Sequence, residues 1–230
     1  MSALRNYPYF WMTATGAFAV AIMIATSRRH RKAILFSALA GLPPAMFSPA
    51  FEGRYWSPRR LLGGGLGIED FLCGFMVAGM LWWAICLLPR FGRMEPDFSR
   101  FWSRYWLVAL PAIAASNGAY FADADGLTLA LIGPAVAAAI LVFLAPSLWR
   151  FSAAGLAAFL ALWWINLKLY FMAWPHFPGS WNQGVWFGRS VAGVPVGELL
   201  WAVAFGACWP AFMAWCMDAK PAPITSAARR

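Results

Sequence analysis

Three carboxylic acids stand in otherwise apolar stretches of this sequence, where a buried acid can donate or accept a proton. Glu69 and Asp70 open the segment LGIEDFLCGFMVAGMLWW at residues 66–83, and Glu198 stands near the start of VAGVPVGELLWAVAFGACWPAFMAW at residues 191–215. Ionisable side chains inside a membrane are costly and usually mark a functional site. Aligning Asp70 with Glu198 brings the two segments into register, which predicts a duplicated unit whose acids meet.

The composition of the chain is that of an integral membrane protein. Of its 230 residues, 62% are hydrophobic and only 12% are charged, and the mean hydropathy is +0.61. A soluble domain with a polar surface does not have this composition. We therefore expect an all-α bundle of transmembrane helices that forms one membrane domain over residues 1–230, because nothing outside the apolar stretches is long enough to bury a core of its own.

Charged clusters divide the chain into seven apolar stretches of the length that a membrane span needs, about 20 residues. The predicted spans are residues 7–26, 33–51, 68–88, 104–122, 127–145, 151–174 and 195–217. Pro43 and Pro44 interrupt the second span, so we expect a kink or an early exit from the membrane there.

The seven spans can be grouped as two units of three helices with one helix between them. Repeat one covers about residues 7–90, the linking helix about 104–122, and repeat two about 127–217. Because four spans separate equivalent helices, both units cross the membrane in the same direction, as parallel repeats related by an axis along the membrane normal do. Loops with tryptophan and arginine precede both acid-bearing spans, and these residues are Trp56, Arg60, Trp181, Trp186 and Arg189.

The distribution of basic residues predicts the orientation, because lysine and arginine accumulate on the cytoplasmic side of a membrane. With the N-terminus outside, the loops on the outer face hold five arginines, namely Arg5, Arg54, Arg59, Arg60 and Arg189. The cytoplasmic face then holds Arg28, Arg29, Arg31, Lys32, Arg90, Arg93, Arg100, Arg104, Arg150, Lys220, Arg229 and Arg230. We expect a multi-pass protein of the inner (cytoplasmic) membrane with its C-terminus in the cytoplasm.

The acids are expected to share one level of the membrane with a lysine. Asp70 precedes Arg90 by 20 residues and Glu198 precedes Asp218 by 20, which places both acids about 30 Å from the cytoplasmic boundary at 1.5 Å per residue. Lys168 is at a similar level. We expect it to face the bundle interior and to bond an acid or the neighbourhood of Asn166; the alternative is that it extends to the membrane interface.

Aromatic side chains accompany these polar residues. The chain has 15 tryptophans, more than the two interfacial belts of a membrane protein usually hold. Trp201 follows Glu198 by three residues and therefore lies on the same helix face. Aromatic faces stabilise a positive charge, although helix packing and interfacial anchoring explain most of the tryptophans equally well. The candidates for substrate binding are Trp163, Trp164, Asn166, Lys168, Tyr170 and Trp201.

Other chemistries find no support in the sequence. The four cysteines lie inside predicted spans without metal-ligand spacing, and the two histidines lie in separate loops, so no metal site is expected. Gly63–Gly65 follows no strand, so it is no nucleotide-binding pattern, and no cofactor is expected. The net charge of +9 follows from the topology and from anionic headgroups. Nucleic acid is therefore not an expected partner.

The residues that open the third and seventh spans resemble a known pair of motifs. The segment IEDFL at residues 68–72 and the segment GVPVGELLW at residues 193–201 are similar to the doubled motif of the lycopene cyclase domain family, whose members have this length, span count and duplication. The chain departs from the family pattern twice. The first copy lacks a proline before its paired acids, and the second has Gly197 where the first acid would stand. The resemblance is thus to a divergent member.

The resemblance implies redox-neutral cyclisation of the ends of a linear carotenoid held within the bilayer. A carboxylic acid would protonate a terminal double bond, the neighbouring alkene would attack the tertiary cation, and a base would remove a proton. The acid must stay protonated near neutral pH, which burial and a second carboxylate favour. The catalytic candidates are Glu69, Asp70 and Glu198, with Asp70 as the counterpart of Glu198 and Glu69 as the group that orients Asp70 or acts as a second acid.

Several alternatives remain open at this point. A membrane cyclase for prenylated aromatic substrates has a similar size and span number. A small transporter with a 3+1+3 arrangement, or a lipid- or isoprenoid-binding protein without catalysis, would also have seven spans. A retinal-binding bundle would carry a Schiff-base lysine in the last span, which has none. The number of rings formed and the oligomeric state, a homo-oligomer included, are open too.

Overall fold

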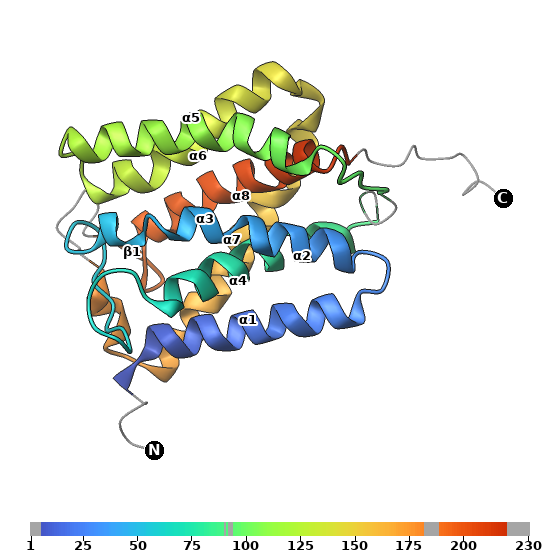
Figure 1. The fold of residues 1–230 in the computed structure, drawn as a ribbon. Helices are drawn as coiled ribbons and strands as arrows, with labels where there is room; N and C mark the ends of the chain where they lie inside the picture. The colour runs from blue at the N-terminus through green and yellow to red at the C-terminus, as the bar shows by residue number, and fades with distance from the viewer. Residues whose placement is uncertain (1–5, 90, 92–93, 182–188, 220–230) are drawn as a thin grey trace.

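The computed structural model describes residues 6–89, 91, 94–181 and 189–219. The chain is mostly helical, and its long helices run side by side (Figure 1). The helices are α1 (Pro8–Thr26), α2 (Arg31–Ala40), α3 (Leu42–Ala45), α4 (Ile68–Leu87), α5 (Phe101–Phe121), α6 (Gly126–Leu144), α7 (Trp149–Ala173) and α8 (Val196–Cys216). Short 3-10 helices are η2 (Ser48–Phe51), η3 (Pro146–Leu148) and η4 (Phe177–Ser180), and β1 (Ser190–Val191) pairs antiparallel with β2 (Val194–Pro195).

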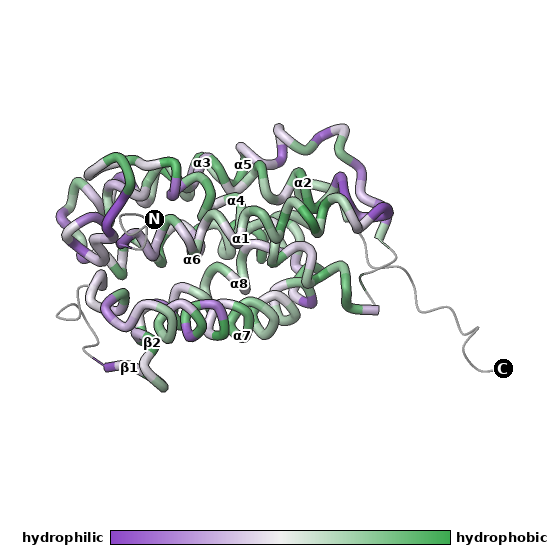
Figure 2. Tube along the Cα trace, turned by 90° about the horizontal axis from the view of Figure 1, so that it is seen from below, coloured by the Kyte–Doolittle hydropathy of each residue, from purple (hydrophilic) through white to green (hydrophobic). Residues whose placement is uncertain are grey.

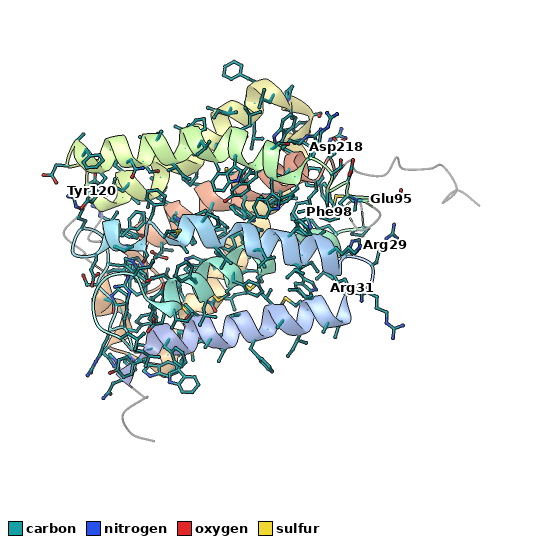
Figure 3. All side chains as sticks on the ribbon, viewed as in Figure 1. Arg29, Arg31, Glu95, Phe98, Tyr120 and Asp218 are labelled. Carbon is teal, nitrogen blue, oxygen red and sulfur yellow. The ribbon has the colours of Figure 1, made fainter. Side chains whose placement is uncertain are left out.

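Five of the described helical stretches are long and apolar enough to cross a membrane. They are α1, α4, α6, the stretch Pro146–Ala173 that ends in α7, and α8. In a second side view, the middle of the helices is mostly apolar and the hydrophilic residues gather toward the two ends (Figure 2). Arg29, Arg31, Glu95 and Asp218 lie at one end, and Tyr120 lies at the other (Figure 3). This separation is typical of a membrane protein.

The predicted second span is two helices and a 3-10 turn. Helix α2 ends at Ala40, and α3 and η2 follow as separate short elements. Pro43 and Pro44 lack the backbone N–H that would continue the α-helical hydrogen bonds. The carbonyl oxygen of Ala40, which Pro44 cannot reach with a donor, instead accepts a hydrogen bond of 2.8 Å from the Tyr105 hydroxyl. The interruption expected at the two prolines is therefore confirmed, and α5 satisfies the freed carbonyl.

The predicted fourth span forms the helix α5, but it is not among the five apolar helices. Near its first turn, Arg104 lies 3.2 Å from the Asp218 carboxylate and donates to the carbonyl of Trp215 at 2.9 Å. These contacts fasten α5 to the end of α8.

Helices α4 and α8 are the central elements of the bundle. Helices α1 and α2 pack against α4, and α6 and α7 pack against α8. Glycine allows the closest approaches: a Cβ on Gly41 would overlap the Gly74 carbonyl of α4, and a Cβ on Gly155 would overlap the ring of Pro210 and the Gly206 carbonyl of α8. A buried polar chain joins three helices, since Trp209 donates to Ser37 at 3.0 Å and Ser37 donates to the Ala78 carbonyl at 2.8 Å.

The loops before α4 and α8 lie at the same end of the bundle. Arg54 in the first loop lies 3.0 Å from Asp123 in the turn between α5 and α6. Trp56 in the same loop forms an isolated antiparallel bridge with Trp181, which precedes α8. The acid-bearing helices therefore both begin at the end that also holds Tyr120 (Figure 3).

Candidate functional site

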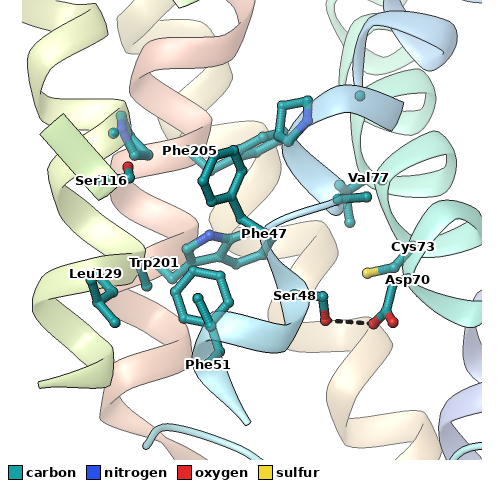
Figure 4. Close-up of a pocket in the computed structure, with 18 of the residues that line it drawn as sticks. Phe47, Ser48, Phe51, Asp70, Cys73, Val77, Ser116, Leu129, Trp201 and Phe205 are labelled. Atoms are coloured by element: carbon teal, nitrogen blue, oxygen red, sulfur yellow. Dashed lines mark hydrogen bonds between the residues drawn. The ribbon is translucent and has the colours of Figure 1, made fainter. Parts of the chain in front are cut away.

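One apolar cavity of about 300 Å³ lies in the bundle, and both Asp70 and Glu198 line it. Its walls come from α1, α3, η2 and α4 on one side and from α5, α6, α7 and α8 on the other. Figure 4 shows Asp70 and Cys73 of α4 on one side of the cavity and Trp201 and Phe205 of α8 on the other. The volume is at the lower end of the range for ligand pockets, and the lining is of the apolar kind that such pockets have.

Asp70 is only 2% exposed, and it accepts hydrogen bonds on both carboxylate oxygens. The hydroxyls of Tyr9 and Ser48 donate to Oδ1 at 2.9 and 2.6 Å. The backbone N–H of Gly67, at the start of α4, donates to Oδ2 at 2.8 Å. The Arg60 guanidinium donates to Oδ2 through Nε at 3.2 Å and to Oδ1 through Nη2 at 3.3 Å. Asp70 is thus a fully bonded, charge-paired carboxylate.

The partner of Asp70, Arg60, is a loop residue that is only 4% exposed. Its Nη2 also donates to Ser48 at 3.1 Å, and its Nη1 lies 3.2 Å from Glu52 Oε2. A buried guanidinium needs such partners, because an unpaired buried charge is strongly destabilising. The Arg60–Asp70 pair therefore holds the loop before α4 against the start of that helix.

Glu69 faces the same loop and is absent from the cavity lining. It is fully buried, and its Oε1 accepts a hydrogen bond of 2.6 Å from the backbone N–H of Leu61. Its Oε2 has no hydrogen-bond partner among the described residues. Neighbouring positions on a helix point about 100° apart, which explains why Asp70 lines the cavity and Glu69 does not.

Glu198 is also buried, at 5% exposure, but its partners carry no charge. The indole N–H of Trp181 and the hydroxyl of Tyr55 both donate to Oε1 at 2.8 Å, and the indole N–H of Trp163 donates to Oε2 at 2.8 Å. Within the described residues, no lysine, arginine or histidine forms an ion pair with Glu198.

The three partners of Glu198 differ in what they can do with a proton. An indole N–H only donates, whereas a phenolic hydroxyl both donates and accepts. Burial and the neighbouring Glu198 carboxylate raise the pKa of the Tyr55 phenol well above its usual range. Tyr55 therefore keeps its proton, and its oxygen can accept a hydrogen bond from a protonated Glu198.

Aromatic rings form the cavity wall beside Glu198. The rings of Trp163 and Trp201 meet edge-to-face with centroids 5.2 Å apart, and Trp201 stacks on Phe205, also at 5.2 Å. Phe159 stacks on Trp163 at 5.8 Å and supports it from behind. The predicted residues Trp163 and Trp201 are thus at the cavity with Glu198, in an arrangement whose ring faces can stabilise a cation.

The expectation that Lys168 bonds an acid is wrong. Lys168 Nζ donates instead to the backbone carbonyl of Ala192, between β1 and β2, at 2.7 Å, and its side chain is partly exposed. Neither Lys168 nor Asn166 lines the cavity. The Nδ2 atom of Asn166 is buried and has no hydrogen-bond partner in the described part of the chain. Counting residues along α7 gives the level of a side chain but not its direction around the helix axis.

Two other predicted residues also lie outside the cavity lining. Trp164 is half-buried and packs against the hydrophobic core. Tyr170 stacks on Trp174 with centroids 5.6 Å apart, and its hydroxyl is hydrogen-bonded to Thr15 of α1. These residues join α7 to its neighbours. Trp186, and Arg90 at the end of the predicted first repeat, lie outside the described residues.

Besides Arg60, which was noted only as a loop residue, sequence reasoning missed four side chains that bond the two acids directly. They are Tyr9, Ser48 and Tyr55, which carry hydroxyls, and Trp181, which was noted only as part of a loop. Three of them precede or follow regular helices, so no periodic pattern marks them. A search of the described residues finds no group of three or more histidine, cysteine or acidic side chains placed to hold a metal ion.

No family model, no curated protein and no solved structure matches this chain.

Proposed function

We propose that this protein is a membrane cyclase that closes a ring at the end of a linear, lycopene-like carotenoid by acid catalysis. The observation that carries the proposal is that acids from two matching helices, Asp70 and Glu198, line one apolar cavity walled by indole rings. The similarity of the IEDFL and GVPVGELLW segments to the lycopene cyclase domain family supports the choice of substrate.

In the proposed reaction, Glu198 is the proton donor. Its partners are uncharged, so a neutral carboxylic acid fits its surroundings. The proton of Glu198 adds to the terminal double bond and leaves a tertiary cation. The electron pair of the neighbouring alkene forms the new carbon–carbon bond and moves the cation into the ring. The Glu198 carboxylate then takes a proton from a ring carbon, which restores the acid and makes the overall reaction an isomerisation.

The other cavity groups would stabilise the cation and exclude water. The faces of Trp163 and Trp201 lie beside Glu198 and are suited to a positive charge. Asp70 would act as a fixed negative charge rather than as a proton donor, because Arg60 and three further hydrogen bonds hold its carboxylate. A dry cavity would keep the cation from being trapped as an alcohol. The reaction consumes no cofactor.

The proposal includes the finer architecture of two parallel three-helix repeats, residues 7–90 and 127–217, joined by the linking helix. The packing around the two acid-bearing helices supports it, because α4 and α8 each contact both of the earlier spans of their own unit. In this arrangement α5 and the broken α2–α3 segment also cross the bilayer, with the N-terminus outside. A cysteine introduced for Asp123 should then react with a membrane-impermeant reagent from the outside only.

The direct test is expression in a host that accumulates lycopene, followed by pigment extraction. Conversion of the linear pigment to a cyclic isomer of unchanged mass is expected, and it should be lost in Glu198→Gln. Absence of any cyclic product from the unmodified protein, with the protein present in the membrane, would overturn the proposal.

Prenylated aromatic compounds are the second substrate class, because the same acid and aromatic wall would suit protonation of their terminal double bond. Supplying both substrate classes to the purified protein separates the two proposals. If neither is cyclised but a linear isoprenoid binds, the protein binds isoprenoids without catalysis.

A further inference from the structure

The segment 41–51 is not continuously helical where it lies beside the cavity. It contains α3, a turn and η2, and Pro44, Phe47 and Phe51 from it line the cavity. Within a bilayer, backbone that is not continuously helical is tolerated where it is buried in protein or lines a cavity. An interruption at this place therefore has a local reason, namely the cavity itself.

The depth of this segment follows from its packing on α4. Gly41 and Gly74 approach so closely that a Cβ on either would overlap the other's carbonyl oxygen. Gly74 is six residues after the start of α4, about 9 Å along the helix axis. The α3 segment is thus level with the second turn of α4, beneath the loops at this end of the bundle and within the apolar layer.

The cavity reaches the surface at this level. Pro44 on α3 lines it and is itself exposed, and the exposed Tyr120, which also lines it, stands beyond this level in the last turn of α5. Between them the lining from α5 and α6 consists largely of small side chains, which include Ala112, Ser116 and Gly133. Ser116 faces the cavity across from Phe47 and Phe51 (Figure 4). The opening is therefore a slot. Phe47 and Phe51 form one of its edges, and small residues of α5 and α6 form the other.

Specific contacts hold the slot at both ends. Toward the end of the bundle that holds Arg29 and Arg31, Tyr105 of α5 donates to the Ala40 carbonyl of α2 at 2.8 Å. Toward the other end, Arg54 lies 3.0 Å from Asp123, donates to the Ala124 carbonyl at 3.1 Å and lies over the Tyr120 ring. The stretch between these two ties is where the cavity opens.

We propose that this slot between α3–η2 and α5–α6 is a lateral portal through which a linear isoprenoid inserts one end group while the rest of its chain stays in the bilayer. The inference rests on the proposed function for the identity of the occupant. A cavity of about 300 Å³ holds a small ligand but not a whole carotenoid, so most of such a chain must lie outside it. The opening at membrane depth is the place where that chain can leave into an apolar medium.

Two substitutions on α5 can distinguish an effect on the portal from a general effect of a larger side chain on helix packing. Ala112 of α5 lines the cavity, and Ala114, two residues later, is exposed and is not part of the lining. Purified protein in lipid nanodiscs would be mixed with lycopene, and association would be followed by quenching of tryptophan fluorescence. Ala112→Phe should slow association about tenfold, which is within the range seen for variants of one binding surface. Ala114→Phe should associate at the unmodified rate.

A further variant, Phe47→Ala, keeps the experiment informative if Ala112→Phe does not fold. Phe47→Ala removes the aromatic edge, so association should become faster, and thermal melting of each variant reports its folding. Equal association rates for folded Ala112→Phe, Ala114→Phe and Phe47→Ala would overturn the portal. Quenching by a phosphatidylcholine with a parinaroyl chain, but not by lycopene, would overturn the isoprenoid occupant and point to a phospholipid chain.

The two proposals fail separately in this experiment. If the unmodified protein binds lycopene in a portal-dependent manner but forms no cyclic product, the proposed function is wrong and the portal stands. If it forms cyclic product while the portal variants associate and react at the unmodified rate, the function stands and the portal is wrong.

Discussion

The first turns of α4 and α8 carry acids at matching positions, yet the two acids have different surroundings. Asp70 is paired with a buried arginine and also accepts hydrogen bonds from Tyr9, Ser48 and a backbone N–H. Among the described residues Glu198 has three hydrogen-bond partners, and all of them are uncharged. Both acids line the same cavity. Matching positions in two helices therefore do not imply matching chemistry.

The difference indicates that the two acids have different roles in the cavity. A carboxylate that accepts hydrogen bonds on both oxygens, two of them from a buried guanidinium, is held in place as an acceptor and an ion-pair partner. An acid among indole and phenol groups can be neutral and can exchange its proton. Asp70 is thus the structural member of the pair, which holds the loop before α4, and Glu198 is the one suited to acid–base chemistry.

The largest effect on stability is expected from Asp70→Asn, which removes the charge partner of the buried Arg60. Leaving one member of a buried ion pair uncompensated costs about 3–5 kcal/mol, and chemical unfolding in detergent micelles would measure the loss. The double variant Asp70→Asn/Arg60→Met removes both charges and should be more stable than Asp70→Asn alone. A double variant that is the less stable of the two would show that the ion pair does not hold this loop.

The largest effect on activity with a smaller effect on stability is expected from Glu198→Gln. Loss of the ionisable proton should reduce cyclised product by a factor of about 100 or more. The amide also places an NH₂ group against an indole N–H, because Trp163 and Trp181 donate to different oxygens. One buried donor then lacks an acceptor, at a cost of about 1–3 kcal/mol.

A matched variant separates these two effects of Glu198→Gln. Adding Trp163→Phe removes the competing indole N–H, so the double variant should regain part of the lost stability without regaining activity. Cyclic product at the unmodified level from stable Glu198→Gln would show that Glu198 is not the proton donor.

A smaller effect, on the pH dependence of stability, tests whether the Tyr55 hydroxyl interacts with Glu198 or only its ring packs. Burial and Glu198 raise the pKa of the Tyr55 phenol in the folded protein, whereas an unfolded tyrosine ionises near a pH of about 10. The stability that this difference contributes is complete below that pH and is lost as the pH rises further, by about 1.4 kcal/mol per unit. Melting temperatures at pH 9 to 11, values chosen to bracket about 10, should therefore fall more steeply for the unmodified protein than for Tyr55→Phe. Parallel slopes would contradict this account.

Local composition predicted much of the bundle and part of the site. Long apolar stretches gave the membrane helices, and Pro43 and Pro44 marked the interruption, because both effects depend only on nearby residues. The shared cavity of Asp70 and Glu198 agrees with their matching positions. Which of Trp163 and Trp164 lines the cavity depends on how α7 is rotated about its axis. The sequence of a weakly amphipathic helix does not determine that rotation.

The loop contacts could not be predicted from the sequence. Arg60 reaches Asp70, and Tyr55 and Trp181 reach Glu198, from segments without regular periodicity. Their positions depend on tertiary packing, in which the loop before α4 meets the loop before α8. Arginine and tryptophan in these loops were visible in the sequence, but nothing there indicated which acid each would bond.

The smallest effect is expected at Lys168, the ionisable residue whose level in the membrane suggested a role with the acids. Its Nζ bonds a backbone carbonyl at Ala192, and the side chain is partly exposed outside the cavity. Lys168→Met should therefore leave cyclised product unchanged and cost about 1 kcal/mol for one hydrogen bond, whereas Lys168→Arg, which keeps a donor, should cost less. Product yield from the lycopene-accumulating host and unfolding in detergent would check both variants. A tenfold loss of product from a Lys168→Met protein of unmodified stability would place this lysine in the reaction after all, and Asp70, Arg60 and Glu198 would then not be the complete set of ionisable groups that the reaction needs.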